Sequence, residues 1–148
     1  MMSAYDPNNI FAKILRGEIP SHKIYEDART LAFLDIMPRS PGHTLVVPKV
    51  EATNLLDIAL DDLTYLMSVV RKLAPEIVAT LGAEGFMLQQ FNGAGAGQTV
   101  FHLHMHIVPR WASLPLKPHA GQMEDPQVLA ETAEKLRAAL AAKGMGNG

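Results

Sequence analysis

The stretch of sequence that decides the fold is FHLHMHIV, residues 101–108, in which histidine occupies every second position. Successive side chains of an extended strand point to opposite faces of its sheet. The pattern therefore predicts a strand with one apolar face, directed into a core, and one face of imidazoles. The apolar face comprises Phe101, Leu103, Met105 and Ile107, and the imidazole face comprises His102, His104 and His106. His104 lies between the other two rings and is the expected centre of any chemistry.

Three interpretations of the imidazole face compete. Decoration of a solvent-exposed surface fits poorly, because three of the chain's six histidines fall within five residues. Alternating histidines can ligate zinc or copper, but neighbours on one straight strand do not easily converge on a single ion, and the chain has no cysteine. The third interpretation, which we favour, is nucleophilic catalysis by a neutral imidazole, because neighbouring rings that tend to charge disfavour protonation of His104.

The segment before this strand is rich in glycine and reads NGAGAGQT, residues 92–99. Glycine permits positive φ and lets a ligand approach the backbone closely, so such a loop can present several N–H donors to an anion. A loose hairpin connection is the alternative. Because the loop adjoins the histidine strand, we expect it to contact a phosphoryl group.

The run from Asn92 to Val108 resembles the motif of the histidine triad (HIT) family, in which histidines alternate with apolar residues. Three further segments match in the same order: NIFAKILRGEIP at 9–20, LAFLDIMP at 31–38 and PGHTLVVPK at 41–49. The likeness extends from about Pro7 to Arg110. The opening FxKIxxGEIP is similar to the bacterial Hint-like branch and is absent from the Fhit branch.

The resemblance implies a purine nucleoside phosphoramidate hydrolase, in which His104 attacks the α-phosphorus and forms a covalent nucleotidyl-histidine that water hydrolyses. It implies that His43 and His102 orient the nucleophile and carry protons, and that His106 supports it through the strand backbone. The other implied contacts are Gln98 and Thr99 at the phosphate and leaving group, Asn92 and Gly97 at the phosphate or ribose, Asp35 at the ribose, and Phe11, Ile14, Ile36 and Leu45 as an apolar slot for the purine.

Other interpretations stay open. Each apolar slot residue could equally pack in the core, and Asp35 could cap a turn. One alternative function with the same chemistry is an Fhit-like hydrolase of dinucleoside polyphosphates. Another, from a different class of protein, is a nucleotide-binding regulatory protein with incidental hydrolysis. Many bacterial relatives carry cysteines near Phe11 that build a structural zinc site, whereas this chain has Ala12 and no cysteine. We therefore expect no metal and no cofactor.

The expected fold class is α+β: an antiparallel sheet of about five strands with one long helix, a short N-terminal helix and an extra C-terminal helix. Helices are predicted at 9–16, at 61–81 and from Asp125, and strands at 23–26, 31–35, 44–48, 86–91 and 101–108. Pro75 lies inside the long helix, where proline costs about 3 kcal/mol, so a kink or break is expected between Arg71 and Pro75.

The domain organisation predicted is a HIT domain at 1–110 and an extension at 111–148, whose helix packs on the same domain or on a dimer partner. Trp111 and His119 in this extension are candidates for closing the substrate end of the site. The resemblance also implies a homodimer formed through the long helix and the sheet.

Composition narrows the class of protein further. The chain has 148 residues, of which 48% are hydrophobic, and a formal net charge of -2. That charge argues against a nucleic-acid partner, and no apolar run approaches the length of a membrane span. Residues 1–6 lack a signal-peptide pattern. Together with the absence of cysteine, these features lead us to expect a cytoplasmic protein.

Overall fold

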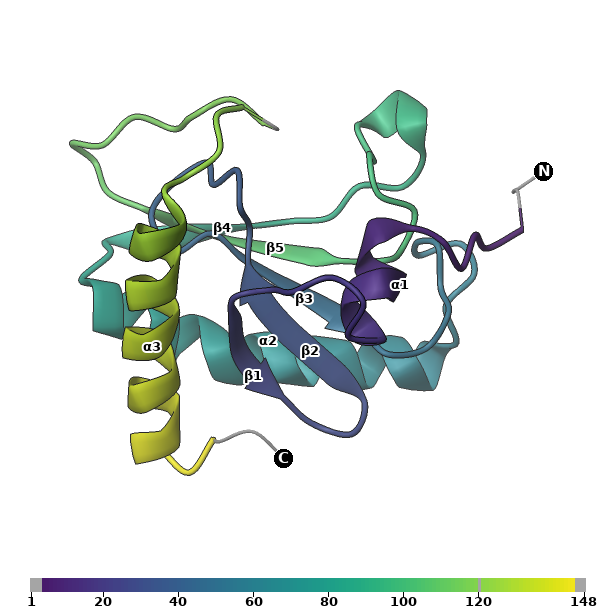
Figure 1. Ribbon diagram of the computed structural model, residues 1–148, viewed down its shortest axis with the longest axis horizontal. Helices are drawn as coiled ribbons and strands as arrows, with labels where there is room; N and C mark the ends of the chain where they lie inside the picture. The colour runs from purple at the N-terminus through teal and green to yellow at the C-terminus, as the bar shows by residue number, and fades with distance from the viewer. Residues whose placement is uncertain (1–3, 120, 146–148) are drawn as a thin grey trace.

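The computed structural model describes residues 4–119 and 121–145 and centres on a five-stranded antiparallel sheet with the order β1-β2-β3-β5-β4 (Figure 1). The strands are β1 (Lys23–Glu26), β2 (Thr30–Leu34), β3 (Thr44–Pro48), β4 (Gly85–Gln89) and β5 (Met105–Arg110). The helices are α1 (Ile10–Leu15), α2 (Leu60–Leu81), α3 (Pro126–Ala142) and the short 3₁₀ turn η1 (Ala94–Ala96). The expected α+β fold is confirmed. The predictions for residues 1–3, 120 and 146–148 fall outside the described residues.

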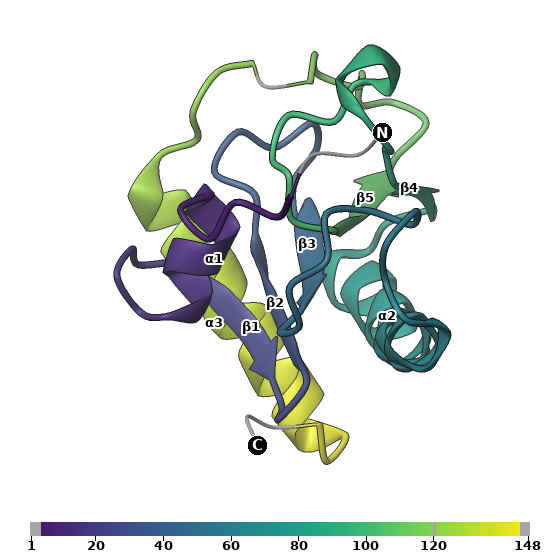
Figure 2. The ribbon, with the colours of Figure 1, turned by 90° about the vertical axis from the view of Figure 1, so that its right-hand side faces the viewer.

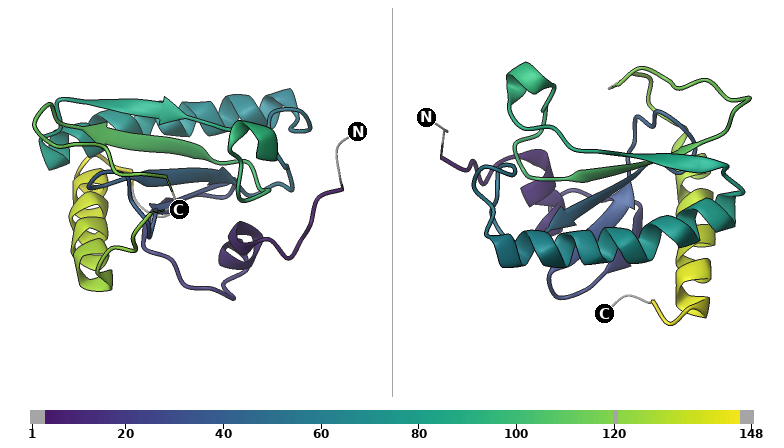
Figure 3. Two further views of the ribbon diagram at one scale, coloured as in Figure 1. Left: turned by 90° about the horizontal axis from the view of Figure 1, so that it is seen from above. Right: turned by 180° about the vertical axis from the view of Figure 1, so that it is seen from behind.

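The sheet separates two apolar layers, with α2 on one face and α1 on the other (Figure 3). Alternate residues of each inner strand enter different layers, as the period of two along a strand requires. The α1 layer contains Phe11, Ile14, Leu31, Phe33, Leu45 and Val47, whereas the α2 layer contains Ala32, Leu34, Val46, Met105 and Ile107. His106, which lies between the last two, is therefore directed to the α1 side.

The long helix does not break at Pro75, so a break, one of the two expected outcomes, is wrong. α2 continues from Leu60 to Leu81 and ends at Gly82, which has a left-handed φ of 66°. Leu73 and Ile77, on either side of Pro75, are both 0% exposed. Burying two such side chains contributes about 1.5–3 kcal/mol each, which offsets the roughly 3 kcal/mol cost of the proline.

The histidine strand is shorter at its start than predicted. β5 begins at Met105, so only His106 of the three histidines lies in the ladder, and Phe101 is 40% exposed instead of buried. Pro48, at the end of the partner strand β3, has no N–H to continue the pairing. Leu103 donates its N–H to the carbonyl of Ala52 instead (2.8 Å).

The C-terminal helix packs within the same chain, against β1 and α2 (Figure 2). Asp125 caps its first turn by accepting from Gln127 N–H (2.8 Å). Its buried stripe, formed by Leu129, Ala133, Leu136 and Leu140, joins the α2 layer. α3 is therefore part of the main core. Among the described residues, no helix combines the length and apolarity needed to cross a bilayer.

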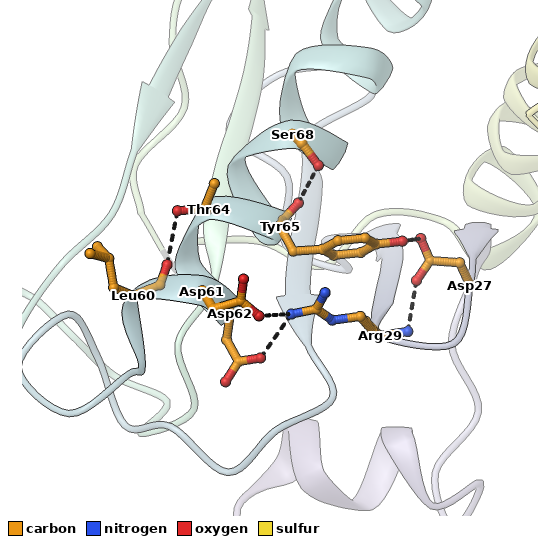
Figure 4. Close-up of polar contacts among 8 residues, drawn as sticks. All are labelled: Asp27, Arg29, Leu60, Asp61, Asp62, Thr64, Tyr65 and Ser68. Carbon is orange, nitrogen blue, oxygen red and sulfur yellow. Dashed lines mark hydrogen bonds and ion pairs between the residues drawn. The ribbon is translucent and has the colours of Figure 1, made fainter.

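A polar cluster ties the turn between β1 and β2 to the first turns of α2 (Figure 4). Arg29 pairs with Asp61 (3.1 Å) and Asp62 (3.0 Å), and its guanidinium lies 4.2 Å from the ring centre of Tyr65. Tyr65 in turn donates to Asp27 (2.7 Å). Because Arg29 and Asp61 are largely exposed, the ion pairs contribute little stability, and the cluster serves mainly to fix how α2 meets the sheet.

Candidate active site

The ring of His104 lies just before β5, with its orientation set by the backbone. Its Nδ1 is 2.7 Å from the carbonyl oxygen of His102. Since a carbonyl can only accept, Nδ1 carries the proton, and in the neutral ring Nε2 keeps a free lone pair. His104 is 8% exposed and lines a cavity of about 180 Å³. The geometry thus presents a neutral imidazole with its nucleophilic nitrogen unprotonated.

A chain of hydrogen bonds fixes the rings of His43 and His106 near His104. The backbone N–H of Arg39 donates to Nδ1 of His43 (3.1 Å), so neutral His43 must carry its proton on Nε2. That proton is donated to Nδ1 of His106 (2.9 Å), which leaves the proton of His106 on Nε2. Among the described residues, no atom accepts a hydrogen bond from this buried Nε2. The ring centres of His104 and His106 are 4.8 Å apart, so an unused N–H donor lies beside the nucleophile.

His102 differs from its expected position. Its Nε2 donates to the carbonyl of Pro48 (2.8 Å), and its Nδ1 accepts from the hydroxyl of Tyr5 (2.6 Å). The side chain therefore joins the N-terminal segment to the end of β3, and only the backbone carbonyl of His102 contacts His104. Relative to the expected roles, His102 acts on the nucleophile through its backbone and His106 through its ring.

Burial keeps the clustered imidazoles neutral. Desolvation lowers the pKa of His104 to about 4 and that of His43 to about 3, against an ordinary histidine value of 6.5. Desolvation also lowers the pKa of His106, and the neighbouring His104 and His43 add to that shift. The hydrogen bond to the carbonyl of His102 raises the pKa of His104 but does not cancel the effect of burial. Near pH 7 all three rings are uncharged.

The cavity combines an apolar wall with the imidazoles. Phe11 closes it beside the nucleophile, its ring perpendicular to that of His104 at 4.9 Å. The lining residues expected from the sequence are Phe11, Ile14, Asp35, Ile36, Thr99, His104 and His106, together with His119, a candidate for the substrate end of the site. The lining residues not expected are Ile10, Ile19, Pro20, Ser21, Phe33, Leu34, Met37 and Val100. Leu45 does not line the cavity; it is 3% exposed and packs in the α1 layer.

The glycine-rich loop is braced by Gln98. The side-chain oxygen of Gln98 accepts from Gly93 N–H (2.8 Å) and Asn54 Nδ2 (3.1 Å). Its amide nitrogen donates to the carbonyls of Thr53 (2.7 Å) and Val100 (3.0 Å). These four hydrogen bonds, to the loop and to residues 53 and 54 outside it, use all the hydrogen-bonding capacity of the buried amide, so its side chain has no donor left for a phosphate.

Asn92 has a similar bracing role, since its side-chain oxygen accepts from Leu55 N–H (2.8 Å). Gly97 is not at the cavity wall but needs glycine, because its φ is +100°. Thr99, which follows, is exposed and lines the cavity. Of the loop residues predicted to contact substrate, Thr99 alone lines the cavity in the described structure.

Asp35 caps a turn, which was one of its two predicted roles. One carboxylate oxygen accepts from Met37 N–H (2.9 Å) and caps the turn after β2, while the other lies 3.7 Å from Nε2 of His43. Burial raises the pKa of this carboxyl group, and the hydrogen bond from Met37 lowers it. The second oxygen is left free for a donor in the cavity.

The cluster Asp35, His43 and His106 brings three ligand atoms within 4.8 Å of one another, close enough for a metal ion. The hydrogen bonds oppose that use. Nδ1 of His43 is engaged by the backbone N–H of Arg39 and Nε2 carries the proton given to His106, so neutral His43 has no free lone pair. Metal binding would require breaking both contacts.

Comparison with known proteins agrees with this geometry. The HIT domain profile matches residues 16–113. The chain belongs to the histidine triad (HIT) family. A HIT-like protein from Methanocaldococcus jannaschii is 46% identical over 102 residues, covering 69% of this chain and 78% of that protein. The adenosine 5′-monophosphoramidase of Schizosaccharomyces pombe is 37% identical over 119 residues, covering 74% and 86%.

Among solved structures, a Hit-like protein from Bartonella henselae, described as involved in cell-cycle regulation and bound to an unknown ligand, superposes with a TM-score of 0.86. It is 47% identical, and the match covers 93% of this chain and 100% of that one. Family membership was the prediction made from the histidine pattern, and it is confirmed.

The structural zinc site of cysteine-containing HIT relatives does not fit this chain. Ala12, buried in α1, offers no ligand atom, and there is no cysteine anywhere in the sequence. His102 is already bonded at both ring nitrogens by Tyr5 and Pro48. Here hydrogen bonds hold the N-terminal segment against β3.

Sequence reasoning missed the residues that act through the backbone or across long separations. Arg39 sets the tautomer of His43 through its N–H, which no side-chain pattern reveals. Tyr5 contacts His102 from 97 residues away. Trp111, a candidate for closing the substrate end, instead donates to the carbonyl of Gly82 (2.9 Å) and does not line the cavity.

Proposed function

We propose that this HIT protein hydrolyses purine nucleoside phosphoramidates by nucleotidyl transfer to water through a covalent nucleotidyl-histidine. The observation that carries the proposal is the bare Nε2 of His104 at the end of an apolar cavity, with the unused N–H of His106 beside it. The family includes a relative named as an adenosine 5′-monophosphoramidase.

In the first step, the lone pair of His104 Nε2 forms a bond to the α-phosphorus while the bond from phosphorus to the leaving nitrogen breaks. The electron pair of that broken bond stays on the leaving nitrogen, which takes up a proton. Negative charge concentrates on the phosphoryl oxygens during the transfer, and Nε2–H of His106 is a preorganised donor for one of them. In the second step water attacks phosphorus, and the electron pair of the phosphorus–nitrogen bond returns to His104.

The apolar wall supports a purine nucleoside as the other half of the substrate. Phe11, Ile14 and Ile36 offer flat and branched surfaces for a base, and Ile36 is 40% exposed although it is apolar. Asp35 immediately precedes Ile36 in the chain, and its second carboxylate oxygen can accept from ribose hydroxyls. These features support a base against the apolar residues and a phosphate beside the imidazoles.

The test compares kcat/KM for adenosine 5′-phosphoramidate between wild type and His104→Ala, both in the presence of a chelator. We expect metal-independent turnover in wild type and a loss of about 10⁴-fold or more in the variant, because removal of a covalent nucleophile abolishes the two-step path. His22→Ala, outside the cavity, is the matched control and should behave as wild type.

Three results would contradict the proposal. Turnover that the chelator abolishes would indicate metal-dependent hydrolysis. Turnover of diadenosine polyphosphates with none of the phosphoramidate would favour an Fhit-like hydrolase. Equal nucleotide affinity in wild type and His104→Ala, with negligible turnover in both, would favour a nucleotide-binding regulatory protein.

We further propose that the chain forms a homodimer through α2 and the edge strand β4. Phe86 and Leu88 of β4 are 43% and 42% exposed, and beside them lie Met67 and Val70 of α2. β4 lies at the end of the strand order, which leaves one side of it available for pairing. Light scattering should give a mass of two chains, and Leu88→Asp should reduce it to one; a wild-type mass of one chain would remove the proposal.

A further inference from the structure

Residues 111–119 and 121–125, which we call the strap, lie between the end of β5 and the start of α3, at the same end of the molecule as η1 (Figures 1 and 2). Hydrogen bonds attach the strap to the rest of the domain at two places. Lys117 N–H donates to the carbonyl of Arg39 (2.9 Å), and Arg39 Nε donates back to the carbonyl of Lys117 (3.1 Å). Glu124 N–H donates to the carbonyl of Ile36 (2.9 Å). His119 lies between these ties.

Between these two attachments, His119 lines the active-site cavity together with His104 and His106. Its ring centre is 6.1 Å from that of His106 and 6.0 Å from that of Phe91. His119 is exposed, whereas His104 and His106 are buried. Of the imidazoles that line this cavity in the described structure, His119 is therefore the one that can exchange protons directly with water.

The proposed reaction needs a proton that the buried rings do not supply. An amine is a poor leaving group unless it is protonated as its bond to phosphorus breaks. His104 has given its Nδ1–H to a carbonyl, and its pKa of about 4 leaves it neutral. His43 gives its proton to His106 within a buried hydrogen bond. Thr99 is at the cavity wall, but an alcohol is a far weaker acid than an imidazolium.

A charged His119 is compatible with a neutral nucleophile. Its positive charge lowers the pKa of His104 and of His106, because like charges repel. The same charge lowers the pKa of the Asp35 carboxyl group. The ionisable groups around His119 are Asp35 after β2, Arg39 and His43 between β2 and β3, His104 before β5, His106 in β5 and Lys117 on the strap itself. The nucleophile is thus a buried imidazole, whereas His119 is an imidazole exposed to water in the same cavity.

We propose that His119 is the general acid that protonates the leaving group. This rests on the proposed function. As His104 Nε2 bonds to phosphorus and the phosphorus–nitrogen bond of the substrate breaks, the imidazolium of His119 transfers its N–H proton to the departing nitrogen, which leaves as a neutral amine. In the hydrolytic step neutral His119 takes a proton from the attacking water, and the electron pair of the phosphorus–His104 bond returns to Nε2. His119 ends protonated and His104 ends neutral, as they began.

The experiment uses two substrates that share a nucleotide and differ in their need for an acid. Adenosine 5′-phosphoramidate must have its nitrogen protonated, whereas the 4-nitrophenyl ester of AMP releases a stable phenolate without a proton. We measure kcat/KM, which reports the steps up to departure of the leaving group, for wild type, His119→Gln and the matched control His22→Gln. The urea midpoint of each variant verifies that it is folded.

We expect His119→Gln to lower kcat/KM for the phosphoramidate about 100-fold, the lower end of general acid catalysis, and to change that for the ester less than about threefold. Equal losses on both substrates would overturn the proposal, since they would indicate phosphate binding or closure of the site. An unchanged phosphoramidate rate would overturn it as well. A wild type inactive on both substrates would instead refute the proposed function.

Discussion

Lowering the pH from 7 to 5 should destabilise the protein sharply, because the imidazole cluster is buried in its neutral form. A histidine with a pKa of 6.5 when unfolded and about 4 when folded, as for His104, binds protons preferentially in the unfolded state throughout that interval. Its stabilising effect is present above the unfolded pKa and is lost as the pH falls toward the folded pKa. Integration over this interval gives a loss of about 2 kcal/mol for such a group.

His43, with a pKa of about 3, adds a similar amount. The sum of about 4 kcal/mol is a large part of the 5–15 kcal/mol that a domain of this size has. The lowered pKa values of His102 and His106 act in the same direction, whereas the raised pKa of Asp35 opposes them.

Urea unfolding followed by far-UV circular dichroism at pH 7, 6 and 5, at one fixed protein concentration, measures the effect. With a slope of about 2 kcal/mol/M, the midpoint should fall by roughly 2 M between pH 7 and pH 5. In His104→Gln the fall should shrink by about half, while His22→Gln should retain that of wild type. A wild-type midpoint that moves by less than about 0.3 M would refute the reasoning, because it would mean that the cluster is not held neutral by burial.

Four further predictions follow from individual contacts. The acid limb of kcat/KM should have its midpoint near the pKa of about 4 of His104, and a midpoint near the ordinary value of 6.5 would contradict a desolvated nucleophile. Tyr5→Phe should cost about 1 kcal/mol in urea unfolding and change kcat only a few-fold, because His102 acts on the nucleophile through its carbonyl; a hundredfold loss of kcat would place Tyr5 in the catalytic machinery. Gln98→Leu should destabilise by about 2–3 kcal/mol, since it removes four hydrogen bonds from the glycine-rich loop, and a neutral result would mean that the loop holds itself. Leu136→Ala should cost about 2–5 kcal/mol, and a loss under 0.5 kcal/mol would show that α3 does not share the main core.

Much of the fold could be predicted from sequence because each element has a strong local signal. The period of two in residues 101–108 and the helical spacing up to Leu81 identified the central strand and the long helix, and glycine ended that helix as expected. Both failures involve proline. Pro75 was expected to interrupt α2, but the burial of its neighbours offsets its cost. Pro48 on the neighbouring strand shortens β5, and this effect depends on the register between β3 and β5, which a local sequence pattern does not contain.

The sequence predicted which residue types form the candidate site, but not which hydrogen bonds their side chains make. Sequence places Gln98 and Asn92 beside the histidines and suggests that amides next to a phosphate site bind the phosphate. In the structure both amides brace the loop. Gln98 donates to the backbone carbonyl of Thr53, and Asn92 accepts from the backbone N–H of Leu55. Long-range backbone partners of this kind decide whether a polar side chain contacts substrate or holds the loop that does.

The protonation pattern of the cluster begins at a backbone atom, and this limits what sequence comparison can find. The N–H of Arg39 engages Nδ1 of His43, which makes Nε2 of His43 a donor to His106 and leaves Nε2–H of His106 beside the lone pair of His104. In the proposed mechanism the nucleophile and the donor to the phosphoryl oxygen are therefore adjacent rings. Their roles cannot be exchanged unless every hydrogen bond from Arg39 to His106 reverses its direction. Any residue except proline supplies that N–H, so the side chain at position 39 can vary without disturbing the tautomers. What the side chain of Arg39 does instead is hold Lys117, and with it the strap that carries His119. One residue thus orders the protons of the buried rings through its backbone and positions the proposed acid through its side chain.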